Sequence, residues 1–176
     1  MASSQKTSGS DWATFRHGPH RGITLMQAHF KEHSFERHSH STYSIGVTHS
    51  GVQSFRCRGV RHSSVAGHVM LFNPDEPHDG SRGSEEGFGY AIIYVEPEFL
   101  DTLSDRSAGV VVSRFFSRTL VKDALAAPLL LSAVEALSQP QESMRAEVLT
   151  STSLLHLLGH YGERTANLKK RVDPGM

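Results

Sequence analysis

The sequence has only one cysteine, Cys57, in 176 residues. A single thiol cannot form an internal disulfide, which fits a reducing compartment, and we expect a cytoplasmic protein. The sequence also lacks any apolar run that approaches the roughly 18 residues that a membrane span needs, and its N-terminus lacks the apolar core of a signal peptide. We therefore expect no association with a membrane.

An excess of charge of either sign is absent as well. The 18 lysines and arginines balance 18 aspartates and glutamates, so the formal net charge is zero. A domain that binds nucleic acid on its own normally carries a basic surface. The composition therefore gives no reason to expect that this chain binds DNA, RNA or an anionic membrane by itself.

Histidine, by contrast, is abundant, and three of the 12 histidines form a pattern. His38 and His40 belong to the segment Arg-His-Ser-His. Successive side chains of a β-strand alternate between its faces, so both histidines would point to the same side. His78 ends the segment Asn-Pro-Asp-Glu-Pro-His and is the third candidate. If the strands form a small barrel whose interior is the shared side, we expect the three histidines to meet there.

Short apolar runs separated by glycine-containing turns dominate the middle of the chain. We predict strands at residues 23–30, 43–48, 52–58, 60–64, 68–72 and 88–95, with turns at 49–51, 59 and 66–67 and a polar loop at 73–86. Strands at a spacing of roughly 8 to 12 residues are typical of an antiparallel sandwich or barrel. Within residues 52–58 we expect Phe55 and Cys57 to point inward and Arg56 and Arg58 outward.

The pattern changes to helical spacing after Pro97. We predict a short helix at residues 97–103, extended segments at 110–113 and 119–122, and two longer helices at 124–137 and 141–163, with Asp123 as the N-cap of the first. The predicted organisation is a disordered arm at 1–11, a β-barrel at 12–96, a helical region at 97–165 and a polar linker at 166–176.

This order of elements resembles the cupin-type effector-binding domain of AraC-family transcription regulators. The closest local matches are residues 37–47, 55–59 and 67–80, and the similarity extends from Trp12 to about Glu163. The resemblance implies a mainly β fold, a cupin-like antiparallel β-barrel (double-stranded β-helix) followed by a two-helix dimerisation region. It also implies a non-enzymatic, homodimeric sensor of a small molecule, whose DNA contacts come only from a C-terminal helix-turn-helix domain that is missing from this chain.

The resemblance places an effector inside the barrel, and small barrels can hold one small ligand. The expected contacts are the three histidines, Arg37 beside them, and the aromatic residues Tyr43, Phe88 and Tyr90. Trp12, on the N-terminal segment, could close over the pocket. The alternative is that these aromatic side chains only fill the core.

The histidines also suggest a metal site. Three neutral imidazoles, His38, His40 and His78, can bind Zn²⁺, Fe²⁺ or Ni²⁺ and leave a coordination position open. Metal-binding cupins usually add a glutamate four or five residues after the second histidine, where this chain has Ser44 and Ile45. Two alternatives stay open. Either the histidines hydrogen-bond or contact an effector without metal, or the chain is a metal-dependent enzyme of the three-histidine dioxygenase type.

Apolar residues at helical spacing mark the two longer predicted helices. A leucine-rich stripe can pair with a second copy of the chain, because large exposed apolar patches mark interfaces. The residues expected in this dimer interface are Leu130, Val134, Leu137, Met144, Val148, Leu155 and Leu158. The alternative is that a stripe of this width packs against the domain's own sheet.

Overall fold

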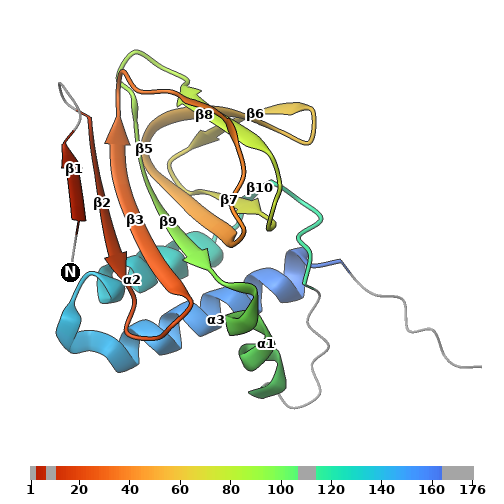
Figure 1. The fold of residues 1–176 in the computed structure, drawn as a ribbon. Coiled ribbons are helices and arrows are strands. Elements are labelled where there is room, and N and C mark those ends of the chain that lie inside the picture. The colour runs from red at the N-terminus through yellow and green to blue at the C-terminus, as the bar shows by residue number, and fades with distance from the viewer. Residues whose placement is uncertain (1–2, 7–10, 107–113, 164–176) are drawn as a thin grey trace, which may run out of the picture.

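The computed structural model describes residues 3–6, 11–106 and 114–163 of the protein. Antiparallel strands form the upper part of the molecule, and two long helices cross beneath them (Figure 1). The strands are β1 (Ser3–Lys6), β2 (Trp12–His17), β3 (Ile23–Phe30), β4 (Phe35–His38), β5 (Tyr43–Cys57), β6 (Val60–Val65), β7 (His68–Phe72), β8 (His78–Arg82), β9 (Phe88–Val95) and β10 (Leu120–Lys122). The helices are α1 (Pro97–Arg106), α2 (Ala126–Leu137), the short 3-10 helix η1 (Pro140–Glu142) and α3 (Ser143–Tyr161).

The 15-residue strand β5 joins two facing sheets. Its first half pairs with β7 and β9 in a sheet of order β1-β2-β3-β9-β5-β7-β10, and its second half pairs with β6 and β8. The register shifts between Thr48 and Ser50, where β5 contains a bulge. The predicted turn at residues 49–51 is therefore wrong, because the strand bends at this point and continues.

Gly51 makes this bend possible. Its φ of +64° lies in the left-handed region, and a Cβ at this position would lie 2.0 Å from the carbonyl oxygen of Gly87. Any side chain would collide with the backbone of the neighbouring segment. The glycine that suggested a turn thus marks a bulge.

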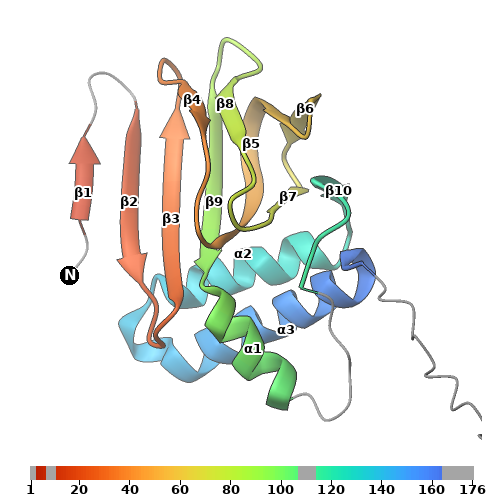
Figure 2. The ribbon, with the colours of Figure 1, turned by 45° about the vertical axis from the view of Figure 1, so that its right-hand side comes forward.

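The two sheets face each other without closing into a complete barrel. Among the described residues β4 pairs only with β8, and β3 pairs only with β2 and β9, so no ladder joins β4 to β3. The pair of β4 and β8 is seen most clearly in Figure 2. The prediction of an antiparallel, cupin-like β-domain followed by helices is confirmed, whereas the predicted closure of the barrel is not observed.

Strand β9 is buried on both faces, which explains its almost entirely apolar sequence. On one face Ile93 and Val95 belong to the core between the sheet and the helices. On the other face Phe88, Tyr90 and Ile92 belong to a second core between the two sheets. Alternation along one strand therefore supplies both cores.

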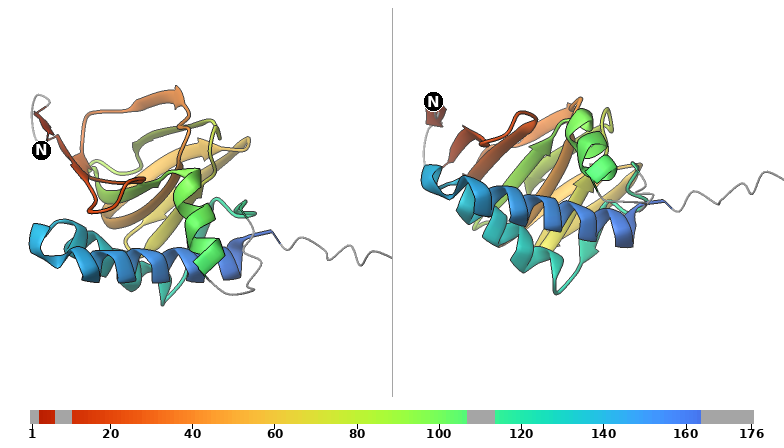
Figure 3. Two further views of the ribbon diagram at one scale, coloured as in Figure 1. Left: turned by 60° about the horizontal axis from the view of Figure 1, so that its bottom comes forward. Right: turned by 90° about the horizontal axis from the view of Figure 1, so that it is seen from below.

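Helices α2 and α3 lie side by side beneath the sheet (Figure 3). The predicted helices at 124–137 and 141–163 are confirmed with their ends moved by about two residues, and α1 extends to Arg106 rather than ending at residue 103. None of the helices in the described ranges is long and apolar enough to cross a membrane.

Some of the residues predicted for a dimer interface are buried in the core, and others are exposed. The core beneath the sheet contains Leu130, Val134, Leu137 and Leu158. Met144 and Val148 are exposed, at 78% and 58%, and Leu155 is half-buried. Four of the seven predicted interface residues therefore pack within the domain itself, as the alternative expected, and pairing through the exposed residues stays a prediction.

The predicted disordered arm, residues 1–11, contains ordered backbone. Residues 3–6 form β1 and pair with β2, whose open edge offers its backbone groups even to a polar segment. Asp11 is buried and accepts the N–H groups of Lys31 and His33 at 2.5 and 2.8 Å. The predicted linker at 166–176 and the predicted extended segment at 110–113 lie outside the described residues.

Asp123 connects the start of α2 to the end of α3. The N-cap position of α2 is Leu125 rather than Asp123 as predicted. The Asp123 Oδ1 atom nevertheless accepts the N–H of Ala126, the first residue of α2, at 2.9 Å, and its Oδ2 accepts hydrogen bonds from His156 and Tyr161 at 2.9 and 2.8 Å. Burial alone would raise the pKa of Asp123, but these hydrogen bonds hold it well below its ordinary value.

We expect Asp123→Asn to lower the free energy of unfolding at pH 7 by on the order of 1–3 kcal/mol, because the variant loses a charged acceptor. Since the folded pKa is depressed, the stability that the charge contributes is fully present above about pH 4, the pKa of an unfolded aspartate. It is lost as the pH falls further toward the folded pKa. Denaturant unfolding at pH 7 and at pH 3 measures both effects.

Asp101→Asn is the control for this variant. The Asp101 carboxylate forms an ion pair with Arg114, and the two side chains are 45% and 66% exposed. We expect this control to change the free energy of unfolding by less than about 0.5 kcal/mol, because exposed pairs contribute little. Equal losses in the two variants would contradict the role assigned to Asp123.

Candidate functional site

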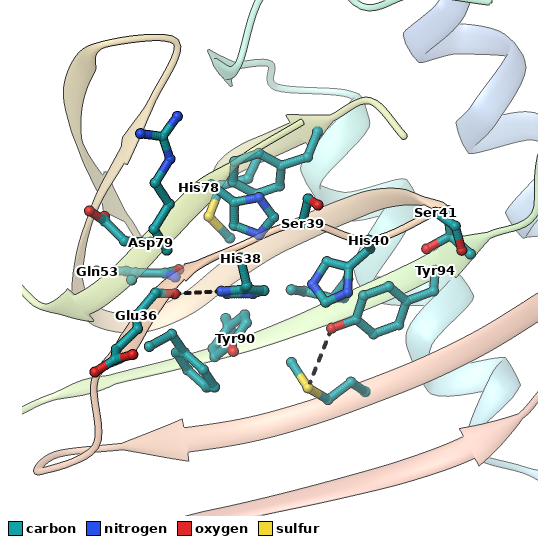
Figure 4. Close-up of a pocket in the computed structure, with 18 of the residues that line it drawn as sticks. Glu36, His38, Ser39, His40, Ser41, Gln53, His78, Asp79, Tyr90 and Tyr94 are labelled. Atoms are coloured by element: carbon teal, nitrogen blue, oxygen red, sulfur yellow. Dashed lines mark hydrogen bonds between the residues drawn. The ribbon is translucent and has the colours of Figure 1, made fainter. Parts of the chain in front are cut away.

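His38, His40 and His78 meet in the space between the two sheets (Figure 4). His38 is the last residue of β4 and pairs with His78, the first residue of β8. Strand β4 ends before His40, so His40 reaches the same place from the following loop. One ring nitrogen of each histidine lies within 4.8 Å of the others. The structure thus brings together the three histidines that the sequence singled out.

Backbone carbonyls orient two of the three rings. The Nδ1 atom of His38 lies 2.7 Å from the carbonyl oxygen of Glu36, and the Nδ1 atom of His78 lies 2.9 Å from that of Glu76. A carbonyl oxygen only accepts, so Nδ1 carries the proton in both rings. The Nε2 atoms of both rings therefore present free lone pairs.

Two histidines of the cluster have a lowered pKa. Burial, followed by the proximity of His38 and His78, lowers the pKa of His40 to about 4. Burial also lowers the pKa of His78, although its bond to Glu76 acts in the opposite direction. A charged imidazole in this place would be both desolvated and repelled by its neighbours.

A cavity of about 940 Å³ opens beside the histidines. Its volume is in the range of pockets that enclose a small organic molecule. The uncharged polar part of its wall is formed by the histidines, Gln53 and the hydroxyl side chains Thr24, Ser39, Ser41 and Thr42, while Glu36, Arg37 and Asp79 are the charged residues that border it. The apolar part includes Phe15, Met26, Phe35, Met70, Phe72, Tyr90, Ile92 and Tyr94.

The predicted effector contacts divide into two groups. Those that line the cavity are Arg37, His38, His40, His78 and Tyr90. Trp12, Tyr43 and Phe88 are not part of its wall. The prediction that these three contact an effector is therefore not supported by the structure.

Each misplaced aromatic residue has a different position. Trp12 lies on β2 with 40% of its surface exposed, and it does not cover the cavity. Tyr43 points to the helix side of β5, where its hydroxyl donates to the carbonyl of Arg114 at 2.5 Å. Phe88 is fully buried and packs against Phe30 and Tyr90. The bulge in β5 explains the error at Tyr43, since side chains before and after it face different cores.

Sequence reasoning missed several wall residues. Tyr94 lies two alternations beyond Tyr90 on β9, so the period of two that placed Tyr90 could have found it. Gln53 is a polar residue among inward-facing apolar ones on β5, and that interruption was its signal. Phe15 belongs to β2, a strand that the sequence did not indicate.

A hydrogen-bonded network leads from His78 away from the cavity. The carboxylate of Glu76, whose carbonyl holds His78, forms an ion pair with Arg58 and accepts the N–H of Asn73 at 3.0 Å. Both of these partners bind the backbone of Phe116. The Asn73 side-chain oxygen accepts the N–H of Phe116 at 2.8 Å, and Arg58 donates to the carbonyl of Phe116 at 2.7 Å.

Residues 115–117 are in turn held against the end of α3. The N–H of Ser117 donates to the carbonyl of Tyr161 at 2.9 Å, and the N–H of Glu163 donates to the carbonyl of Phe115 at 2.8 Å. A continuous set of hydrogen bonds therefore runs from a histidine in the cavity to the last residue that the structure describes.

Two facing antiparallel sheets on a pair of helices, with a cavity between the sheets, define a cupin-like domain. Residues 20–158 match the family of AraC-like ligand binding domains. The chain belongs to this family.

A curated relative points in the same direction. The chain is 25% identical over 153 residues to a protein of Bacillus subtilis (strain 168) named as an uncharacterized HTH-type transcriptional regulator, YbfI. The match covers 86% of this chain and 55% of YbfI, so the chain spans about half the length of this relative.

Solved cupin structures are similar at low identity. A cupin 2 conserved barrel domain protein from Salinispora arenicola CNS-205 is 18% identical, with a TM-score of 0.46 over 57% of this chain and 88% of that chain. An oxalate decarboxylase from Lactobacillus farciminis, solved as a formate complex, is 17% identical, with a TM-score of 0.48 over 56% of this chain and 31% of that chain.

Proposed function

We propose that the chain is the small-molecule-sensing part of a transcription regulator. An effector binds in the cavity beside the histidines and changes how the end of α3 is held. The observation that carries this proposal is the network from His78 through Glu76 to Phe116 and Tyr161. The family and the regulator relative support it.

The physical basis of the response is a difference in contacts between two states. A ligand shifts an equilibrium only as far as it binds one state better than the other. An effector that touches His78 acts on a ring whose other nitrogen is bonded to the segment carrying Glu76. We infer that this contact transmits the response. In this proposal the chain has no catalytic role, works in the cytoplasm, and reaches DNA only through a separate helix-turn-helix domain.

The test begins with the small molecules that co-purify with the protein, extracted and identified by mass spectrometry. Hydrogen exchange is then compared between loaded and stripped protein. We expect loading to slow amide exchange in residues 115–117 and 158–163. In Glu76→Gln we expect these amides to exchange at least about tenfold faster and to lose their response to loading, because a charged hydrogen-bond acceptor is gone.

Glu135→Gln is the matched control, since the Glu135 side chain is 67% exposed in an ion pair on the helix surface. We expect it to exchange like the wild type. Protection that depends on loading in the wild type and persists in Glu76→Gln would overturn this route, and the absence of any loading effect would overturn the sensing proposal.

We also propose that two copies pair through α3. Met144 and Val148 are one helical turn apart, so they share the exposed face of the helix. We expect the wild type to sediment as a dimer and the double variant Met144→Glu, Val148→Glu to sediment as a monomer, because buried unpaired carboxylates are costly. Gln139→Glu, outside this face, controls for added charge and should stay dimeric. A monomeric wild type would contradict the pairing.

A second candidate is a divalent metal ion at the three histidines. The orientation of His38 and His78 favours it, because metal-binding histidines typically donate their other N–H to a carbonyl or carboxylate. Imidazole ligands suit Zn²⁺, Fe²⁺ or Ni²⁺, and among the described residues no carboxylate joins the cluster. A metal ion bound there would act as a Lewis acid toward a molecule in the cavity. The corresponding enzyme would be a three-histidine dioxygenase.

Titration with Co²⁺, followed by its visible absorption bands, tests the metal site directly. We expect one ion per chain, and we expect His40→Ala to weaken binding at least about tenfold because one imidazole ligand is lost. His160→Ala, on the exposed end of α3, is the control and should bind like the wild type. The absence of bands in the wild type would contradict the metal site. Oxygen uptake by iron-loaded protein on a thiol or diketone would favour the enzyme over the sensor.

A further inference from the structure

Gln53 is the one uncharged amide side chain in the wall of the cavity. Figure 4 labels its side chain among those that line the cavity. Only 6% of the residue is exposed, and its Oε1 atom has no hydrogen-bond partner among the described residues. A buried carbonyl oxygen without a partner is unfavourable, so each such atom calls for an explanation. A donor group on a bound molecule would satisfy it.

Two further polar atoms of the wall are acceptors. The Nε2 atoms of His38 and His78 carry lone pairs, because the Nδ1 atoms of both rings donate to backbone carbonyls. Hydroxyl groups of Ser39, Ser41 and Thr42 also line the cavity, but Oε1 of Gln53 and these two nitrogens are acceptors to which a donor group on a bound molecule can bind.

This end of the cavity does not suit an anion. Arg37 is the cationic residue of the wall, and it is exposed. Glu36 and Asp79, the other charged residues of the wall, are both acidic. A carboxylate or phosphate here would lose its hydration without gaining a buried positive partner. The site favours a neutral donor such as a hydroxyl group.

The rest of the wall suits a flat ring. Phe15, Phe35, Tyr90 and Tyr94 border the cavity together with methionine and isoleucine side chains. Aromatic pairs gain from stacked and edge-to-face contact in addition to the burial of apolar area. An aromatic frame can fill this part while its polar group reaches Gln53.

We infer that the cavity binds a neutral hydroxylated aromatic molecule of the phenol class, whose hydroxyl donates to Oε1 of Gln53. This inference rests on the proposed function of the cavity as an effector site. It makes Gln53 the residue that distinguishes a phenol from the same ring without its hydroxyl.

Three fluorinated probes of similar size test the inference by ¹⁹F NMR: 4-fluorophenol, fluorobenzene and 4-fluorobenzoate. The protein is first treated with EDTA so that binding to a metal ion does not contribute. We expect the wild type to bind 4-fluorophenol at least about tenfold more tightly than fluorobenzene, because fluorobenzene has no hydroxyl group to donate to Oε1 of Gln53. We expect 4-fluorobenzoate to bind more weakly than 4-fluorophenol.

Two substitutions assign the preference to Gln53. In Gln53→Leu we expect the ratio of the two affinities to fall to about twofold or less, with the affinity for fluorobenzene nearly unchanged. Gln53→Glu keeps an acceptor at this position and should retain a preference for the phenol. Gln139→Leu, at an exposed position outside the cavity, should behave like the wild type. Circular dichroism confirms that each variant is folded.

The outcomes separate this inference from the proposed function. Equal binding of 4-fluorophenol and fluorobenzene to the wild type, or an unchanged preference in Gln53→Leu, would overturn the phenol assignment while leaving the cavity as a binding site. Preference for 4-fluorobenzoate would overturn it in favour of an anionic ligand. Binding of none of the three probes would overturn it as well. The sensing proposal is judged separately, by the co-purifying molecule and its effect on hydrogen exchange.

Discussion

The architecture depends on the pairing of β5 with β9 and on the bulge that interrupts it. Before the bulge β5 belongs to the sheet that covers the helices, and after it the strand crosses to the facing sheet with β8. Only a glycine fits the contact between Gly51 and Gly87 at this point. Because β5 belongs to both sheets, it fixes how far apart they lie. The cavity occupies the space between them.

The sequence predicted the strands whose burial is regular. Residues 23–30, 68–72 and 88–95 were predicted as strands and coincide with β3, β7 and β9. Strand β8, with the sequence His-Asp-Gly-Ser-Arg, carries no apolar alternation, so its sequence does not predict a strand. It is a strand because it pairs with β4 and β5. Tertiary pairing overrides local propensity in such a segment, and this information is not present in the segment itself.

The candidate site was predictable only where the signal lies within a short stretch of sequence. Two histidines separated by one residue can be recognised as a candidate site in the sequence alone. The third histidine can be recognised because it ends a short, proline-rich segment. Tyr43 and Gln53 lie on the same strand, yet the face to which each points depends on the bulge between them, which no pattern at their own positions reveals. The helix residues show the same limit: helical spacing predicted a stripe, but it could not tell that Leu158 packs inward while Met144 and Val148 remain exposed.

The network behind His78 ends on main-chain atoms. Arg58 and Asn73 bind the backbone of Phe116, and the backbone of Ser117 binds that of Tyr161. Every residue type presents the same N–H and C=O groups apart from proline, so a substitution at Ser117 would keep its main-chain bond to Tyr161 and lose only the bond that its hydroxyl donates to the same carbonyl. Under the proposed function, related domains that differ in how strongly they respond to an effector should differ chiefly at positions 58, 73 and 76, whose side chains make the bonds.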